Sequence, residues 1–261
     1  MRPFLFLLII IFVSTKLLAQ NQHSNNVSQF EREMISLGLM SNANGEKTEK
    51  YPNGKTKYIG NYLNGKEHGH WIWWYKNGNK YFEGYFKQGL KDSNWVYYNE
   101  KGKPWLVETF VLNKRNGKWL EYHPNGKLKM SGYFVLDVED STWIEYYQNN
   151  KKLSFVNYSM GKRNGSLLQW YPNGKIKREG TYVNNKKEGK WTDYFTNGKK
   201  EAEGIFQNDY MEGLYLEWDT KGRLLTERVM KKDKVIEEKI YEKGIYVKKV
   251  FYGEEQPVKM E

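Results

Sequence analysis

The sequence predicts an all-β protein, an elongated single-layer antiparallel β-meander built from 24-residue hairpin repeats. Three observations lead to this prediction: many aromatic residues, two columns of turn residues with a 24-residue period, and aromatic columns between the turns. Because a period of this length is typical of repeat architectures, the chain is expected to stack similar units along one axis.

Aromatic residues make up 16% of the 261 residues. Such numbers of Tyr and Trp suit a half-buried sheet, where a flat ring covers one face and meets water at its edge. The chain contains no cysteine, which excludes disulfide bonds and a lipidated N-terminal cysteine. Strand pairing and packing must therefore hold the chain together.

The first residues have the pattern of a secretory signal peptide, assigned to residues 1–19. Arg2 forms a positive n-region, Phe4 to Val13 an apolar h-region, and Leu17-Leu18-Ala19 a cleavage site. The apolar run is too short for a bilayer, and an uncleaved N-terminal anchor is the alternative. We therefore expect export to the periplasm, the envelope or the medium.

Two columns of turn residues recur with the 24-residue period. The first is Gly54, Gly78, Gly102, Gly126, Asn150, Gly174, Gly198 and Gly222. The second is Gly65, Gly89, Asn113, Asp137, Gly161, Asn185, Asp209 and Asp233. Because Gly, Asn and Asp tolerate positive φ, the chain is expected to reverse twice per repeat. Eight strand-turn-strand-turn units are therefore assigned to residues 51–234.

Aromatic columns with the same period lie between these turns. One is Tyr62, Phe86, Phe110, Phe134, Tyr158, Tyr182, Phe206 and Met230, and another is Trp71, Trp95, Trp119, Trp143, Leu167, Trp191 and Tyr215. A glycine column holds Gly60, Gly84, Gly132, Gly180 and Gly204. A missing side chain leaves room for a neighbouring ring, so the sequence predicts rings packed on glycines.

Turn chemistry bears on the pairing of the strands. Tyr171 to Gly174 (YPNG) fits a three-residue loop with a G1 bulge, and a two-residue Asn-Gly turn is the alternative. With the favoured three-residue loop, Trp71 and Trp73 are expected on the face opposite Phe82 and Phe86. Roughly sixteen strands at about 4.8 Å predict a twisted ribbon on the order of 75 Å long.

The two ends of the chain fall outside the repeats. Residues 20–50 form a polar segment in which Ser28 to Glu31 has capping-box spacing, so a short helix is a candidate cover for the first strand edge. Residues 235–261 lose the period and are expected to form degenerate capping strands and a tail.

The repeating pattern resembles a known family. A unit such as GKWTDYFTNGKKEAEGIFQNDYMEG, residues 189–213, resembles the bacterial variant of the MORN repeat, and the likeness covers Tyr51 to Tyr241. The resemblance implies an elongated single-layer sheet without catalytic activity that serves as a scaffold and as a surface for protein partners or membrane lipids. Some bacterial relatives are labelled antitoxin components, and the family transfers no fixed functional residues.

Four residues depart from the pattern of the family. Glu108, Val156 and Arg228 replace the inner glycine, and Leu167 replaces the Trp. We expect these repeats to bend the sheet differently.

The first candidate site is a basic rim directly after the first turn, interrupted only by Asn79. Its residues are Lys55, Lys103, Lys127, Lys151, Lys175, Lys199 and Arg223. Successive members should lie two strands, about 9.6 Å, apart and form a ladder for an anionic polymer or headgroup surface. The alternative is a solvated rim that only keeps the sheet soluble.

The second candidate site is a surface of exposed rings. Its residues are Trp71, Trp73, Trp95, Trp119, Trp143 and Trp191. A single layer leaves faces uncovered, and spaced rings suit stacking on sugars or gripping a protein. The alternative is structural: each Trp fills the space left by a glycine across from it.

Catalytic, cofactor-binding and metal-binding residues are not assigned. His68 and His70 lie at strand spacing but have no third ligand at a fixed offset. Glutamates recur as Glu83, Glu179, Glu203 and Glu227, whereas a catalytic pair occurs once, so we expect cross-strand pairing with lysines.

Together these observations favour a non-catalytic exported scaffold that binds a protein or an anionic envelope partner through a long basic and aromatic surface. The alternative is an antitoxin-like protein that neutralises a toxin partner. Removal of Arg2 and Lys16 with the signal peptide lowers the formal net charge from +11 to +9. The remaining positive charge attracts anionic membranes, glycans or acidic proteins. Export makes nucleic acid the least favoured partner, and the sequence does not fix the oligomeric state.

Overall fold

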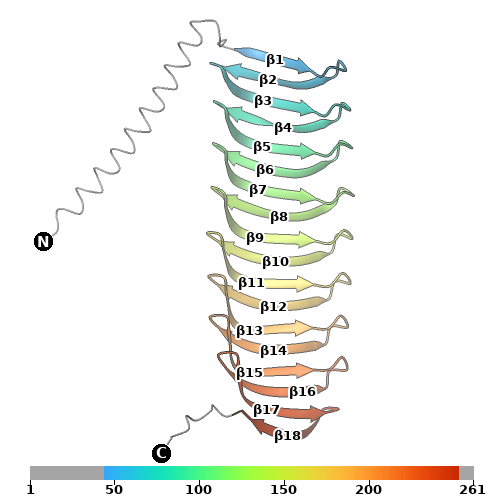
Figure 1. Ribbon diagram of the computed structural model, residues 1–261, viewed down its shortest axis with the longest axis vertical. Helices are drawn as coiled ribbons and strands as arrows, with labels where there is room; N and C mark the ends of the chain where they lie inside the picture. The colour runs from blue at the N-terminus through green and yellow to red at the C-terminus, as the bar shows by residue number, and fades with distance from the viewer. Residues whose placement is uncertain (1–43, 253–261) are drawn as a thin grey trace, which may run out of the picture.

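The computed structural model describes residues 44–252 and shows one sheet of eighteen antiparallel strands, with no helix in this part of the chain (Figure 1). The strands are β1 (Gly45–Lys50), β2 (Thr56–Leu63), β3 (Lys66–Trp74), β4 (Lys80–Lys87), β5 (Leu90–Tyr98), β6 (Pro104–Val111), β7 (Lys114–Tyr122), β8 (Leu128–Val135), β9 (Val138–Tyr146), β10 (Lys152–Ser159), β11 (Lys162–Trp170), β12 (Ile176–Val183), β13 (Lys186–Tyr194), β14 (Lys200–Gln207), β15 (Tyr210–Trp218), β16 (Leu224–Lys231), β17 (Lys234–Glu242) and β18 (Ile245–Phe251).

Every strand pairs with its neighbours in the sequence, so the sheet is a continuous meander of stacked hairpins (Figure 1). At about 4.8 Å between strands, the stack is about 80 Å long. Across residues 44–252, β1 and β18 each pair on one side and form the two ends of the sheet. The predicted single-layer meander is confirmed.

The YPNG segments form three-residue loops between strands, as the sequence predicts. In the turn from β11 to β12, the Gly174 N–H donates to the Tyr171 carbonyl at 2.8 Å, and the Tyr171 N–H donates to the Lys175 carbonyl at 2.9 Å. Gly174 has a φ of 91°, which a residue without a Cβ adopts without strain. This geometry is a turn followed by a G1 bulge, so the two-residue alternative is wrong.

The predicted assignment of faces is wrong, because each hairpin contains a second bulge. Trp74 lies opposite Lys80 but Trp73 lies opposite Phe82, which leaves Tyr81 without a partner. A one-residue shift moves every following side chain to the other face. Trp73 therefore shares the face of Phe82 instead of opposing it.

We call the two sides of the sheet the aromatic face and the mixed face. The aromatic face carries the Trp71 column, the Tyr62 column and the inner glycines. The mixed face carries Ile59, Ile72, Val96, Leu120, Ile144 and Leu168 together with Glu83, Glu179, Glu203 and Glu227.

Rings laid flat on glycines make the core of this single layer. Trp71 is 2% exposed and Trp95 is 1% exposed. A Cβ added to Gly60 would lie 2.0 Å from the Trp71 ring, and one added to Gly84 would lie 2.3 Å from Trp95. Backbone on one side and neighbouring rings on the other thus exclude water without a second layer.

The second turn edge is tied together by its Asn and Asp residues. The Asn113 side chain accepts from the Lys91 N–H at 2.6 Å, while the Asn113 N–H donates to the Lys91 carbonyl at 2.8 Å. The same side-chain contact is made by Asp137, Asn185, Asp209 and Asp233. This double contact explains why Asn and Asp alternate with Gly in that column.

The ends of the sheet differ from the repeats between them. β1 lies ahead of residue 51, where the sequence places the first repeat, and its alternating charges in GEKTEK give no strand signal. β17 and β18 are joined at Lys243 and Gly244 instead of a YPNG loop. The predicted signal peptide and short helix lie outside the described residues. Residues 44–252 include no helix long and apolar enough to span a membrane.

Candidate binding surfaces

The predicted basic rim is part of the fold. The ammonium group of Lys151 donates to the Asn173 carbonyl of the next turn at 2.7 Å. Lys55, Lys175 and Lys199 make the equivalent bond to the turn that follows them. Arg223 instead pairs with Asp219 in its own turn at 2.6 Å. Four rim lysines therefore connect successive repeats, while the equally exposed Lys103 and Lys127 make no such bond to the turn that follows them.

The apparent break in the rim still bonds to the next turn, through the carbonyl one residue before the one that the lysines reach. Asn79 stands where other repeats have a lysine, and its amide donates to the Glu100 carbonyl at 2.7 Å. An amide and an ammonium group both supply the required donor, whereas only one carries charge. Five of the eight residues in this column thus donate a hydrogen bond to the next turn, which favours the structural interpretation over a polyanion ladder.

Two further residues of the YPNG motif bind the next repeat. The Tyr171 hydroxyl donates to the Tyr194 carbonyl at 2.7 Å, and the Asn173 amide donates to the Thr196 carbonyl at 2.9 Å. The tyrosine contact recurs at Tyr51, Tyr75 and Tyr147, and the asparagine contact at Asn53, Asn77, Asn125, Asn149 and Asn197. The recurring turn residues therefore hold repeats in register.

The predicted tryptophan surface is largely core. Trp71, Trp95 and Trp191 are buried, so these three rings do not form an exposed surface. Trp119 and Trp143 are half-buried, and their rings contact each other at a tilt of 40° with centroids 5.5 Å apart. Trp73 is half-buried as well. The prediction fails for the buried rings because bulges place them over glycines on the neighbouring strand.

Sequence reasoning missed a column of cations that covers these rings. The Lys91 ammonium lies 4.4 Å from the Trp95 ring and donates to the Tyr97 hydroxyl at 2.7 Å. Burial lowers the pKa of Lys91. Arg115, Arg163 and Lys187 cover Phe134, Tyr182 and Phe206 in the same way. Their spacing of 24 residues, or 48 where Glu139 interrupts the column, was the signal that could have revealed it.

Open rings do occur on the N-terminal half of the aromatic face, formed by Trp73 together with rings that were not predicted. Trp73 and Phe82 have ring centroids 5.6 Å apart, and Tyr97 and Trp105 are 6.1 Å apart. Trp105 is 40% exposed and Tyr81 is 42% exposed. We call Trp73, Tyr81, Phe82, Tyr97 and Trp105 the ring strip. Trp105 is an irregular residue that does not recur with the repeat.

The C-terminal half of the same face carries a groove instead. Arg178 and Asp193 form a two-bond ion pair, with Nε–Oδ1 and Nη2–Oδ2 distances of 2.5 and 2.9 Å. Beside them Ala202 lines a hollow of about 440 Å³, which Tyr215 and Glu217 also line. We call this hollow the Ala202 groove.

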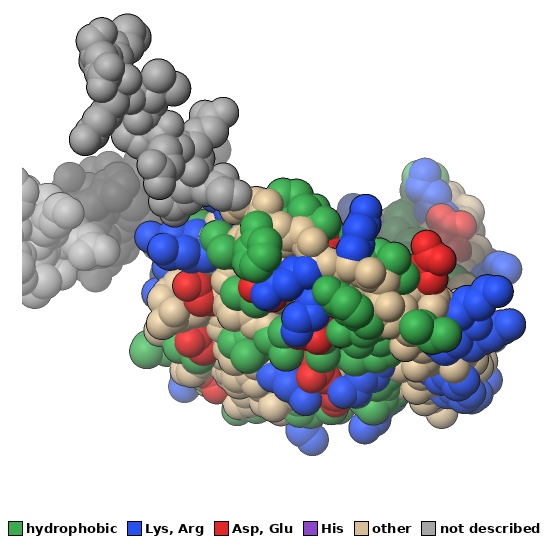
Figure 2. All heavy atoms as spheres, turned by 90° about the horizontal axis from the view of Figure 1, so that it is seen from below, with side chains coloured by type: hydrophobic (Ala, Val, Ile, Leu, Met, Phe, Trp, Pro, Cys, Tyr) green, Lys and Arg blue, Asp and Glu red, His purple; other side chains and the backbone are tan. Residues whose placement is uncertain are grey.

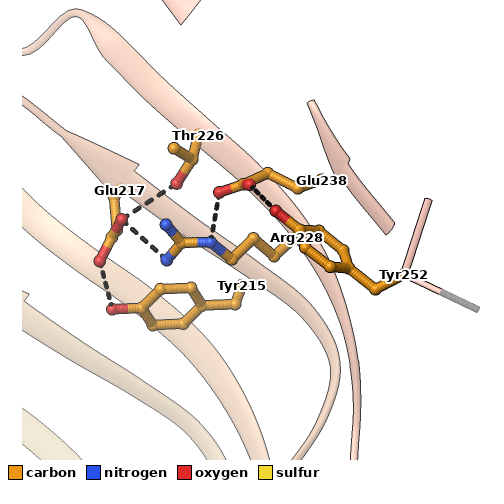
Figure 3. Close-up of polar contacts among 6 residues, drawn as sticks. All are labelled: Tyr215, Glu217, Thr226, Arg228, Glu238 and Tyr252. Carbon is orange, nitrogen blue, oxygen red and sulfur yellow. Dashed lines mark hydrogen bonds and ion pairs between the residues drawn. The ribbon is translucent and has the colours of Figure 1, made fainter. Parts of the chain in front are cut away.

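A polar network fixes the wall of this groove nearest β18 (Figure 3). Glu217 accepts from the Tyr215 hydroxyl, the Thr226 hydroxyl and the Arg228 guanidinium, each at 3.0 Å. Arg228 also donates to Glu238 at 2.7 Å, and the Tyr252 hydroxyl donates to Glu238 at 2.7 Å. Burial and the bond to Glu217 raise the pKa of Tyr215 to about 12, so its hydroxyl stays protonated.

Several glutamates of the mixed face are paired. Glu83 accepts from Lys80 at 2.8 Å and from the Tyr98 hydroxyl, and Glu179 accepts from the Tyr194 hydroxyl at 2.6 Å. The structure brings no group of three or more metal-ligating side chains together within residues 44–252. Figure 2 shows Lys and Arg side chains projecting around the outline, with apolar and acidic side chains between them.

Comparison with known proteins supports the repeat assignment. The family model described as "MORN repeat variant" matches residues 43–64, 67–88, 115–135, 163–184 and 187–208. Two stretches between these matches contain Glu108 and Val156, which replace the inner glycine. No curated protein matches the sequence.

Among solved structures, a Photorhabdus luminescens Tc holotoxin pore is similar with 10% identity over 76% of this chain and a TM-score of 0.23. This chain spans 13% of that toxin chain. A likeness at this level carries no argument about function.

Proposed function

The chain is a MORN repeat protein, and from this premise we propose that it is a non-catalytic, exported scaffold that binds a protein or an anionic envelope partner. The ring strip carries the proposal, because Tyr81 and Trp105 expose their rings beside the half-buried rings of the strip. Exposed aromatic anchors are typical of binding surfaces.

Positive charge supports recognition of an acidic partner. Lys103 and Lys127 remain exposed on the rim, and the chain after residue 19 has a formal net charge of +9, from +11 less Arg2 and Lys16. Such charge speeds encounter with an acidic partner but is screened by salt. The rings therefore supply affinity, and the charge supplies attraction at longer range.

The proposal is tested by capture from an envelope fraction with three baits. These are the unmodified chain, a strip variant with Tyr81→Ser and Trp105→Ser, and a rim variant with Lys103→Ser and Lys127→Ser. We expect one specific partner on the unmodified chain, strong loss with the strip variant, and a salt-dependent reduction with the rim variant. Equal capture by the strip variant, or no partner at low salt, would contradict the proposal.

Export is tested separately. A C-terminally tagged chain should appear in the periplasmic or extracellular fraction, and deletion of residues 2–19 should retain it in the cytoplasm. Cytoplasmic recovery of the complete chain would show that the export part of the proposal is wrong.

A further inference from the structure

The Ala202 groove exists because of one small side chain that the fold does not require. The equivalent positions along the aromatic face hold Tyr58, Phe82, Leu106, Met130, Ser154, Arg178, Ala202 and Thr226. Five repeats before Ala202, Phe82 fills the same backbone position with a ring. Since this backbone accepts a phenyl group, the hollow of about 440 Å³ at Ala202 is a property of the side chain.

The hollow continues across the face. A second hollow of about 200 Å³ is also lined by Arg178, Asp193, Ala202 and Tyr215, and it extends to Trp191 and Phe206. The four shared residues place the two hollows side by side over β12 to β16, and we include both in the Ala202 groove. This size suits a small ligand of one or two rings.

Donors and acceptors lie side by side at the centre of the groove. The Arg178–Asp193 pair is partly exposed, at 41% and 34% of the side chains, so unused guanidinium N–H groups and carboxylate lone pairs face solvent. Glu217 is held in place by three hydrogen bonds and keeps acceptor capacity beside them. These groups are already positioned, so a ligand would bind without reordering them.

Flat apolar surface borders these polar groups. Tyr171 and Phe195 line the end of the groove near the YPNG turns. Trp191 and Phe206 line the other end, beneath the ammonium group of Lys187. A planar ion pair between aromatic residues combines directional hydrogen bonding with apolar contact. That combination matches a ligand whose edges are polar and whose faces are C–H bonds.

We propose that the Ala202 groove binds an uncharged saccharide of one or two rings. Each hydroxyl of a sugar both donates and accepts, so adjacent hydroxyls pair with Arg178 and Asp193 together. The ion pair is neutral as a unit, and a charged ligand would compete with it. Glu201 and Glu217 are balanced by Lys177 and Lys187, so the charged lining favours neither an anion nor a cation. This inference is independent of the scaffold proposal, which rests on the ring strip at the other half of the face.

The test titrates the purified chain with lactose, maltose and diacetylchitobiose as neutral probes. A dimer of galacturonate and a dimer of glucosamine are the charged comparisons of the same size. We expect saturable binding of at least one neutral probe by calorimetry, with a change in tryptophan fluorescence from Trp191. Absence of neutral binding at millimolar concentrations, or binding of the charged probes alone, would overturn the proposal.

A filling variant locates the site. Ala202→Phe introduces the side chain that Phe82 already has, and it should weaken saccharide binding at least tenfold. The matched control, Ser154→Phe, places the same ring at the equivalent position of β10 and should leave binding unchanged. Equal binding by Ala202→Phe and the unmodified chain would also overturn the proposal.

A second variant keeps the test decisive if the filled groove disturbs folding. Asp193→Asn with Arg178→Gln retains hydrogen-bonding groups of similar size but removes the positioned ion pair. We expect at least a tenfold loss of saccharide binding, with circular dichroism unchanged. Unchanged affinity in this folded variant would contradict the role assigned to the pair.

Discussion

The two halves of the aromatic face have the same backbone and opposite chemistry. Tyr58, Trp73, Phe82 and Tyr97 in the N-terminal half correspond, five repeats later, to Arg178, Asp193, Ala202 and Glu217. The ring pair Tyr58–Trp73, with centroids 4.7 Å apart, is thus replaced by an ion pair with a 2.5 Å contact. Residues that recur hold the repeats together, whereas residues that vary between equivalent positions determine what the surface can bind.

The largest expected effect concerns what both halves share, the ring laid on glycine. Trp95→Ala should lower the free energy of unfolding by about 3–5 kcal/mol, because it removes a buried ring and leaves a cavity over Gly84. Denaturant unfolding followed by circular dichroism measures this loss. Trp105→Ala is the control and should change stability by less than about 1 kcal/mol, since this ring is 40% exposed. Equal losses would contradict the distinction between core and surface rings.

The next effect is confined to the C-terminal half and depends on pH. Hydrogen bonds from Tyr252 and Arg228 hold the pKa of Glu238 below its ordinary value of 4.5. Because the folded pKa is lowered, the stability from Glu238 is present above about pH 4.5 and is lost as pH falls through the folded pKa. Glu238→Gln should remove about 1.5–3 kcal/mol at neutral pH and flatten the acid loss of stability. An unchanged pH profile would show that the network in Figure 3 does not stabilise this end.

A third effect tests the packing of a ring on an inner glycine, at a repeat where both the ring and the glycine are replaced. Val156 lies opposite Leu167, where most other repeats place Gly opposite Trp. Leu167→Trp alone should cost about 1–3 kcal/mol through overpacking, and Val156→Gly should relieve it. The double variant should therefore be more stable than the sum of the single changes by about 1 kcal/mol. Additive values would mean that the two positions do not share this space.

The smallest effect is expected at the rim. Lys175→Met removes an exposed bond to the Asn197 carbonyl and should change stability by no more than about 0.5 kcal/mol. Asn173→Ala should cost about 1 kcal/mol, because this residue supplies bonds to Thr196 and to its own turn. Thermal unfolding of the two variants side by side compares them. A larger loss for Lys175→Met would reverse this order.

The period, the turn positions and the meander could be predicted because turn residues report local backbone conformation. The faces could not, because the bulge at Tyr81 and its equivalents has no consistent residue type: the column holds Tyr81, Trp105, Lys129, Leu153, Lys177, Glu201 and Leu225. A single bulge residue that the sequence does not mark moves the side chains that follow it to the other face of the sheet.

The candidate site was predicted least well, for a related reason. A lysine that donates to the next turn and a lysine that binds a polyanion look alike in sequence. Structural contacts such as the hydrogen bond from Lys151 to the Asn173 carbonyl are needed to distinguish the two roles. The Ala202 groove depends on a small residue at a position where several other repeats have a larger side chain. The small size of Ala202 indicates a hollow only once the strand registers are known. Leu167 is likewise explained only by the Val156 side chain across from it.

The direction of the backbone hydrogen bonds determines how this molecule bears mechanical load. They run parallel to the long axis, between strands that lie across it (Figure 1). Tension applied through the two ends would load the hydrogen bonds of one strand at a time, so hairpins would detach in succession. Tension along the strands would instead load many hydrogen bonds in shear at once. The YPNG tyrosine and asparagine contacts add side-chain bonds to each peeling step. A chain anchored at one end would therefore extend in equal increments at low force, releasing one repeat per step.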